Sequence, residues 1–312
     1  FAPTIDAIFV ARGQTGRMMF LQVSAAVLNW ALNPLFIHGL DLGVAGAAWA
    51  TIVARVPAVT IGLWLVRRPL GWRVATDDTL RRILRLGFPM GTNVLAYALV
   101  YFLMLRTTIS PLGPEVNAAL GIGFSALEGI TYPIFLGLSL AVTSLVGREL
   151  GAGRPEGAMR AAKVALPLTT ALGLASGLVF WFLAPTICAP FTDDPVVLAE
   201  AVRYARALGW SQPSVAWEAL AEGVLLGAGA SRAVFWMSAP LNMLRVPLGY
   251  FLAFPLGWTA DGAWWAINLT SFLKAGIKGH RRLFRKRLKA VAGDRGFYSQ
   301  ANEDWLKDSG VR

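Results

Sequence analysis

The segment "LAYALVYFLMLRTTISPLGPEVNAALGIGFSALEGITYPIFLGLSLAVTSLVGRELGAGR" (residues 95–154) decides the fold class. Between Glu115 and Arg148, Glu128 is its only charged residue. Strands of membrane barrels span about 10 residues and alternate in polarity, whereas a helix needs about 20 mostly apolar residues to cross a bilayer. The segment therefore predicts membrane-spanning helices, one of which carries a carboxylate near its middle.

The composition of the whole chain points the same way. Of its 312 residues 55% are hydrophobic and 15% are charged, whereas soluble domains carry about 25% charged residues. The net charge of +11 comes from basic residues in short segments between apolar runs, which favours membrane topology over nucleic-acid binding. The single cysteine, Cys188, and two distant histidines, His38 and His280, give no disulfide framework, metal site or catalytic constellation. We expect no metal, no cofactor and no enzymatic activity.

Hydropathy predicts an all-α membrane protein, a polytopic helical bundle with eight complete helices and part of a ninth in residues 1–10. The expected spans are 18–37, 44–66, 86–108, 118–146, 164–184, 208–228, 233–253 and 261–278.

The loops between these spans divide sharply by charge. Segments 12–17, 67–85, 148–163, 229–232 and 274–289, which fall on one side, hold 21 of the 29 lysines and arginines. Segments 38–43, 109–117, 185–197 and 254–262, on the other side, hold none. The positive-inside rule then places the basic side and the C-terminus in the cytoplasm.

Two stretches of the sequence repeat each other, residues 12–52 and 227–268. Each has a Gly-rich turn ending in arginine, an apolar helix with a Pro-Leu pair at Pro34 or Pro247, and a Gly-Ala-(Ala/Trp)-Trp-Ala entry to the next helix. The spacing is about 213 residues, and both copies start on the same membrane side, as in the parallel repeats of some transporters.

The repeat predicts the domain organisation. Residues 1–66 form the C-terminal part of a first lobe, 67–85 a cytoplasmic connector, 86–278 a second six-helix lobe and 279–312 a basic cytoplasmic tail that binds lipid headgroups. Equal halves would need about 130 further residues before Phe1, which would make two pseudo-symmetric six-helix lobes. We expect the chain to lack that N-terminal part.

Carboxylates inside membrane spans are the leading candidates for function. A carboxylate at the bilayer centre costs about 2.5–3.5 kcal/mol and therefore usually faces a protein interior or a wet cavity. Glu128 is the first candidate, as a group that takes up and releases a proton or transiently binds Na⁺; the alternative is a helix-packing carboxyl. Glu218 and Glu222 share a helix face, so their repulsion favours protonation or a bound cation at one of them; a solvated helix rim is the alternative for Glu222.

Further candidates are polar or basic. Gln212 precedes Pro213, where the helix is expected to kink and expose carbonyls. Arg245 precedes Pro247, and Arg55 precedes Pro57 in what we take to be the symmetry-related place. Each arginine is expected either to pair with a carboxylate or snorkel, or to form a gating ion pair. Arg106 is interpreted as an interface anchor.

Several motifs resemble one known family. "LNPLFIHGLDLGVAGAAWAT" (32–51), "LVGRELGAGRPEGA" (145–158), "EGVLLGAG" (222–229) and "RVPLGYFLAF" (245–254) are similar to segments of MATE transporters, the multidrug and toxic compound extrusion family. The resemblance extends to about residue 290. It implies two lobes flanking a cleft, and export of organic cations in exchange for Na⁺ or H⁺. Glu128 matches a glutamate that many prokaryotic relatives carry nine residues before the glycine that is Gly137 here.

The chain also departs from the family pattern. In one Na⁺-coupled branch of the family, the first helix of the second lobe carries a glutamate about ten residues after a Gly-x-Pro entry. In this chain the entry is residues 87–89, and Tyr97 occupies the position of that glutamate. Asn93, Tyr97 and Tyr101 recur at helical spacing. They are expected either to line the cleft and offer aromatic surface to a cation or to pack the lobes together.

The sequence thus favours a monomeric secondary antiporter in the cytoplasmic membrane of a prokaryote, with small cationic substrates and no nucleic-acid partner. A lipid or lipid-linked oligosaccharide flippase of the same superfamily is the alternative. A flippase would need a cleft lined with Arg or Lys to bind pyrophosphate. The second lobe has only Arg245 and Arg106 as bases within its expected spans. The sequence shows no paired catalytic groups, such as a His pair or a Ser-His arrangement, which argues against a membrane-embedded enzyme. A fragment without transport activity is the remaining possibility.

Overall fold

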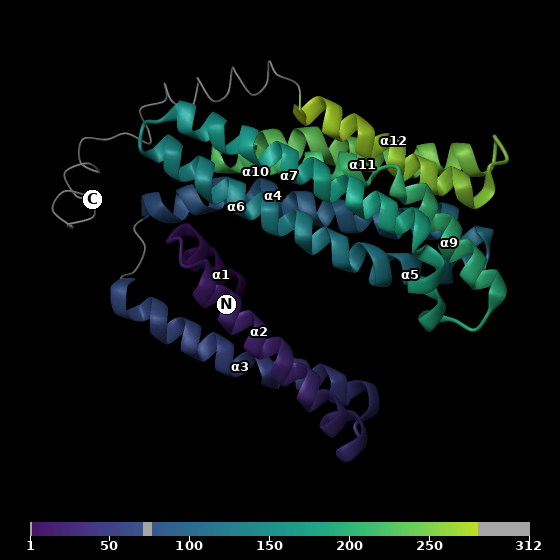
Figure 1. The fold of residues 1–312 in the computed structure, drawn as a ribbon, viewed down its shortest axis with the longest axis horizontal. Coiled ribbons are helices and arrows are strands. Elements are labelled where there is room, and N and C mark those ends of the chain that lie inside the picture. Colours follow the sequence, from purple (N-terminus) through teal and green to yellow (C-terminus); the bar gives the residue numbers. More distant parts are fainter. Residues whose placement is uncertain (1, 71–76, 280–312) are drawn as a thin grey trace. The chain divides into compact units, whose positions relative to one another are not determined.

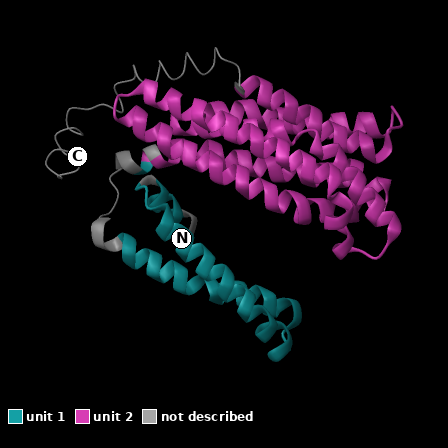
Figure 2. Ribbon diagram, in the orientation of Figure 1, with its two compact units in different colours: residues 1–80 teal, residues 81–312 magenta. Residues whose placement is uncertain are grey.

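The structure is a computed structural model that describes residues 2–70 and 77–279. All regular elements in these two ranges are helices, which confirms the predicted all-α class. The chain divides into two compact units, Phe1–Leu80 and Arg81–Arg312 (Figure 2). Their boundary falls in the predicted connector 67–85. Residues 71–76 of that connector and 280–312 of the basic tail lie outside the described residues, so the roles assigned to both segments remain predictions.

Three helices lie wholly within the described residues of unit 1 (Figure 1). These are α1 (Ala2–Ala11), α2 (Thr15–Pro34) and α3 (Gly43–Leu70), with a π-helical turn, η1 (Leu35–Gly39), after α2. Ile5, Phe9, Leu21 and Val66 form its core.

Unit 2 contains the remaining helices (Figure 1). In chain order they are α4 (Asp77–Met104) with η2 (Leu105–Ile109) and η3 (Ser110–Leu112), α5 (Pro114–Ile122), η4 (Gly123–Glu128), α6 (Gly129–Gly151), α7 (Pro155–Phe182), α8 (Ala184–Cys188), η5 (Ala189–Phe191), α9 (Pro195–Gly209), α10 (Gln212–Gly227), α11 (Ser231–Ala253) and α12 (Thr259–Gly279). The largest core cluster joins α4, α5, α9 and α12 around Tyr204 and Trp264.

The outer surfaces of both units are apolar. Trp30, Phe88 and Trp236 are each more than 70% exposed, which suits contact with lipid chains but not with water. Five stretches are long and apolar enough to cross a membrane: Thr15–Gly39, Gly43–Val66, Ile83–Leu112, Pro114–Gly151 and Pro155–Phe182. α10 has 16 residues and is shorter than these stretches. α11 and α12 are long enough but more polar, because they carry Arg245, Lys274 and Lys278.

The predicted span 208–228 matches α10 except at its start, because α10 begins at Gln212 and residues 208–209 belong to the preceding helix. Two helices occupy this region, α9 and α10, separated at Trp210 and Ser211. Hydropathy missed α9 because the helix is amphipathic, with Ala201, Tyr204 and Leu208 buried and basic residues on its exposed face. The break does lie at the position where Gln212 and Pro213 were expected to interrupt the helix.

Three short turns in the chain share one backbone conformation. Gly13, Gly153 and Gly229 have φ values of 68°, 69° and 69°, which only glycine adopts without strain. In each turn the next residue donates its N–H to a carbonyl five residues back, at 2.8 Å, a typical helix C-cap. Gly13 and Gly229 are 216 residues apart, and a helical hairpin follows each of them, α2–α3 and α11–α12.

Helix α10 lies unusually close to its neighbours. A Cβ at Gly223 would lie 2.5 Å from the Ser139 carbonyl oxygen of α6, and one at Gly227 would lie 2.7 Å from that of Thr143. The Thr143 hydroxyl donates to the Gly223 carbonyl at 3.0 Å. Small residues four apart allow such close backbone packing between membrane helices, and this packing fixes the position of the acidic residues on α10.

This packing predicts that alanine substitution is harmful at one glycine and harmless at another. Gly223→Ala should lower the stability of the protein by about 1–3 kcal/mol, because the added methyl group forces α10 away from α6. Gly137→Ala on α6 is the matched control, because a Cβ there meets nothing within 4 Å. Thermal unfolding of the purified protein in detergent measures both; equal stability of the two variants would contradict the close contact.

Candidate functional site

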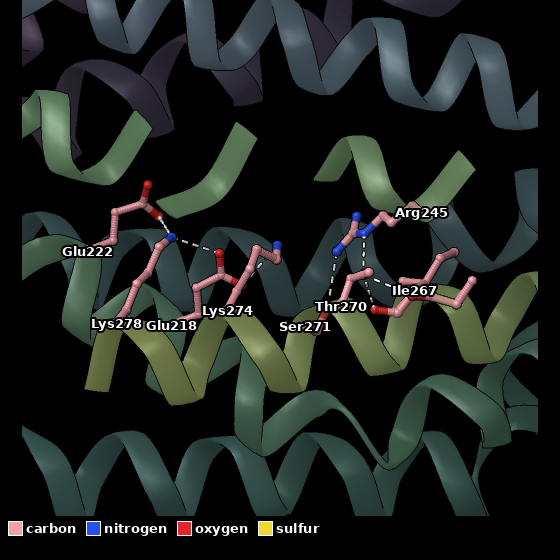
Figure 3. Close-up of polar contacts among 9 residues, drawn as sticks. Glu218, Glu222, Arg245, Ile267, Thr270, Ser271, Lys274 and Lys278 are labelled. Carbon is pink, nitrogen blue, oxygen red and sulfur yellow. Dashed lines mark hydrogen bonds and ion pairs between the residues drawn. The ribbon is translucent and has the colours of Figure 1, made fainter. Parts of the chain in front are cut away.

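Four charged side chains form a compact group between α10 and α12, the lysine–glutamate cluster of Glu218, Glu222, Lys274 and Lys278 (Figure 3). Glu218 is held from two sides: its Oε2 lies 3.0 Å from Lys274 Nζ, and its Oε1 accepts from Lys278 Nζ at 2.8 Å. Lys278 Nζ also lies 3.8 Å from Glu222 Oε2. The lysine side chains are 6% and 0% exposed and that of Glu218 is 12% exposed, whereas that of Glu222 is 24% exposed.

The arrangement follows from helix spacing. Glu218 and Glu222 are four residues apart on α10, and Lys274 and Lys278 are four apart on α12, so each pair projects from one face. Burial of an unpaired charge is costly, whereas a hydrogen-bonded ion pair offsets the lost hydration. The repulsion expected between the two glutamates is thus relieved by lysines of the same chain.

The lysines correct two interpretations made from the sequence. Lys274 and Lys278 were assigned to the basic segment 274–289 outside the last span, and the second lobe was credited only with Arg245 and Arg106 as bases. The structure buries both lysines inside unit 2. Their four-residue spacing, which matches that of Glu218 and Glu222, was the signal that sequence reasoning missed.

Arg245 lies inside unit 2, on α11, and is 3% exposed. Its Nε donates to Thr270 Oγ1 at 2.8 Å and its Nη2 donates to Ser271 Oγ at 3.1 Å, both on α12 (Figure 3). Among the described residues no carboxylate lies within ion-pair distance of its guanidinium. The expected ion pair is therefore replaced by two hydroxyl groups, which suits a buried guanidinium because five N–H donors need acceptors.

Glu128 ends the π-helical turn η4 and is partly buried. The Tyr204 hydroxyl, from α9, donates to Glu128 Oε1. The tyrosine ring packs against Gly123, where any Cβ would collide with it, and against Trp264 at 4.7 Å between ring centroids. Sequence reasoning singled out Glu128 but missed Tyr204, which lies on the helix that hydropathy overlooked.

Asn93, Tyr97 and Tyr101 share one face of α4, as their spacing predicted. The rings of Tyr97 and Tyr101 lie 4.8 Å apart, and Tyr101 contacts Phe124 edge-on at 5.6 Å. Both tyrosines lie in the neighbourhood of Arg245 and Glu128. These tyrosines therefore belong to the same polar interior as Glu128.

Gln212 begins α10 and is 3% exposed. Its Nε2 donates weakly to the Leu208 carbonyl at 3.5 Å, across the break between α9 and α10. This hydrogen bond joins the two sides of the break, so its position fits a role in the helix break.

The candidates in unit 1 occupy different places. Pro34 is the last residue of α2, whereas Pro247 lies inside α11. Arg55 is exposed on α3 and lines a small hollow with Asp6 and Gln22. The symmetry relation expected between Arg55 and Arg245 is wrong, because Arg55 lies on α3, which corresponds to α12, whereas Arg245 lies on α11. The 216-residue spacing of the turns relates Arg245 to Asn29 on α2.

Within residues 2–70 and 77–279 no group of three or more His, Cys, Asp or Glu side chains could hold a metal ion. A transient Na⁺ at Glu128 stays a prediction.

The helical fold, the apolar outer surface and the buried charges together define a polytopic helical membrane protein. A family model described as MatE matches residues 89–251, and the chain belongs to this family. It is 29% identical over 290 residues to a "Probable multidrug resistance protein NorM" of Pseudomonas aeruginosa, covering 85% of this chain and 59% of the relative. A "Multidrug resistance protein MdtK" of Edwardsiella ictaluri is 28% identical over 247 residues, with 73% and 52% covered. The chain thus spans little more than half the length of these relatives.

Solved structures support the same fold. A crystal structure of MATE in the straight conformation superposes with a TM-score of 0.84 at 21% identity, over 94% of this chain and 67% of that one. A MATE transporter, ClbM, in complex with Rb⁺ gives a TM-score of 0.73 at 24% identity, over 90% and 65%.

The Glu128–Tyr204 contact predicts an ordered pair of effects. Tyr204→Phe should destabilise the protein by about 1–3 kcal/mol, because it leaves a partly buried carboxylate without its donor. Glu128→Gln should cost less, since the amide oxygen still accepts from the tyrosine. Thermal unfolding checks the order, with Tyr132→Phe on the exposed face of α6 as control; equal losses in all three variants would contradict it.

The lysine–glutamate cluster predicts unequal roles for its two acids. Glu218→Gln should destabilise strongly, by about 3–5 kcal/mol, because it leaves two buried ammonium groups with one distant carboxylate. Glu222→Gln should lower the stability much less, because Lys278 keeps its ion pair with Glu218. Denaturation of the two variants in the same detergent measures the difference, and a more damaging Glu222→Gln would contradict the observed geometry.

Proposed function

We propose that this chain is part of a secondary active multidrug efflux transporter that exports organic cations in exchange for H⁺ or Na⁺. The observation that carries the proposal is the set of carboxylates, Glu128, Glu218 and Glu222, inside a helical unit of the MatE family. Relatives named as multidrug resistance proteins support an export function, and a MATE structure in complex with Rb⁺ supports cation binding.

The geometry suits exchange at Glu128. Its one hydrogen-bond partner among the described residues is the neutral Tyr204 hydroxyl, so the carboxyl group can carry a proton or release it without losing its position. Such a site drives transport only if its affinity for the ion or cargo differs between the inward-open and outward-open states. The two like-oriented halves predicted from the sequence repeat would supply these states.

The remaining assignments belong to the same proposal. The protein would act as a monomer in the cytoplasmic membrane of a bacterium, with its C-terminus in the cytoplasm and small organic cations as substrates. It would need no cofactor besides the coupling ion.

A flippase for lipids or lipid-linked oligosaccharides remains the second candidate, favoured by the buried bases Arg245, Lys274 and Lys278. One solved neighbour, at a TM-score of 0.79 and 22% identity, is described by a reversed polarity of its binding pocket that suggests a different function. In this chain, however, both lysines are neutralised by carboxylates, so the cluster does not offer a net positive surface to a pyrophosphate.

The function is tested by reconstituting the protein in proteoliposomes and imposing a proton or Na⁺ gradient in the presence of a fluorescent organic cation. We expect gradient-dependent movement of the dye, and its loss in Glu128→Gln, which removes the ionisable group and keeps the hydrogen bond. Arg106→Gln at an exposed position is the matched control. Dye movement that is unchanged in Glu128→Gln would remove Glu128 from the mechanism, and dye-independent lipid movement would favour the flippase.

A further inference from the structure

The length of α7 places its two ends at the two surfaces of the membrane. The helix has 28 residues, which at 1.5 Å per residue gives about 42 Å, close to the full thickness of a bilayer with its headgroups. It begins within the basic segment 148–163. Towards its other end Leu174, Leu178 and Phe182 recur every four residues and are exposed, so they form one apolar face for acyl chains. The end at Phe182 therefore lies at the level of the lipid headgroups.

A guanidinium group and two indole rings meet at this end of α7. Arg206, on α9, donates from its Nε to the Trp181 carbonyl oxygen in the last turn of α7, at 3.4 Å. The ring of Trp181 contacts that of Trp210 edge-on, with 5.6 Å between the ring centroids. The two tryptophans are 40% and 58% exposed, and Arg206 is exposed as well. Exposed tryptophan and arginine side chains at the end of a span are typical of the membrane–water interface.

The charge of Arg206 has no acidic partner. In the part of the chain that the structure describes, no carboxylate lies within ion-pair distance of its guanidinium, and the Trp181 carbonyl is its one hydrogen-bond partner. Arg203, one turn earlier on α9, differs: its guanidinium lies 3.1 Å from Glu200 Oε1 and 3.9 Å from Asp261 Oδ1. The exposed face of α9 thus carries one compensated guanidinium and one that still has N–H donors and a full charge to offer.

We propose that Arg206, Trp181 and Trp210 form a binding site for the headgroup of an anionic phospholipid in the leaflet at this end of α7. A guanidinium binds two phosphate oxygens through parallel N–H donors, and the two Nη groups of Arg206 serve this purpose. The indole rings lie beside the glycerol backbone, where one side of each ring meets apolar chains and the other meets water. The acyl chains pack along the apolar face of α7.

Net charge decides which phospholipid binds best. A zwitterionic lipid brings its own ammonium group beside the phosphate, and that group competes with Arg206. Phosphatidylglycerol brings one uncompensated negative charge, which matches the one uncompensated guanidinium. Inorganic phosphate shares the contact with the guanidinium but has no acyl chains, so it binds this surface much more weakly than the lipid does.

The test measures lipid binding to the purified full chain in detergent by native mass spectrometry, with phosphatidylglycerol and phosphatidylcholine of identical acyl chains. The wild type should prefer phosphatidylglycerol. Arg206→Gln should weaken phosphatidylglycerol binding about fivefold and leave phosphatidylcholine binding unchanged. Arg203→Gln removes the same charge one turn away and is the matched control; it should keep the wild-type preference, because that guanidinium is already bound by two carboxylates.

Two further measurements keep the test decisive. Arg206→Lys keeps the charge but loses the fork of donors, and it should retain part of the preference. Phosphatidylglycerol with a photoreactive group beside its phosphate should label the segments around Trp181 and Trp210 in the wild type and in Arg203→Gln, but not in Arg206→Gln. Equal phosphatidylglycerol binding by the wild type and Arg206→Gln would overturn the proposal. So would labelling confined to other segments, or displacement of the lipid by inorganic phosphate at the same concentration.

Discussion

The rule that a buried charge needs a partner governs the interior of unit 2. Glu218 is accessible to water only at its edge, and two lysines from another helix neutralise it. The same requirement explains Arg245, which lacks a nearby carboxylate and uses Thr270 and Ser271 instead, and Glu128, which takes its donor from Tyr204. These contacts tie α10 and α11 to α12, and η4 to α9, so the polar groups help to fix the helix register.

Close backbone packing gives these contacts their precision. α10 approaches α6 through Gly223 and Gly227, and it approaches α7 where a Cβ at Gly173 would lie 2.7 Å from the Pro213 Cα atom. The break at Trp210 and Ser211 separates this tightly held helix from α9. Glu218 and Glu222 therefore sit on a short helix with its own packing, while the partner of Glu128 sits on the preceding one.

The sequence predicted the all-helical membrane class because apolar length is a direct physical requirement of the bilayer. It also predicted Glu128 and the Glu218–Glu222 pair, since an isolated charge in an apolar run stands out. It could not predict Lys274 and Lys278 as partners, because lysines near the end of a span are usually solvated, and only the α10–α12 contact shows otherwise. α9 was missed because an amphipathic helix has a polar face that lowers its mean hydropathy.

The lysines of α12 also bear on how the protein is made. A lysine at the centre of a helix raises the cost of its transfer from the translocon into lipid by about 2.5–3.5 kcal/mol. α12 carries two lysines in its C-terminal third, where the cost is smaller but still unfavourable. The chain emerges from its N-terminus, so Glu218 reaches the membrane 56 residues before Lys274. An α10 already in place offers the neutralising acid, and biogenesis of the last helix then depends on a helix inserted two segments earlier.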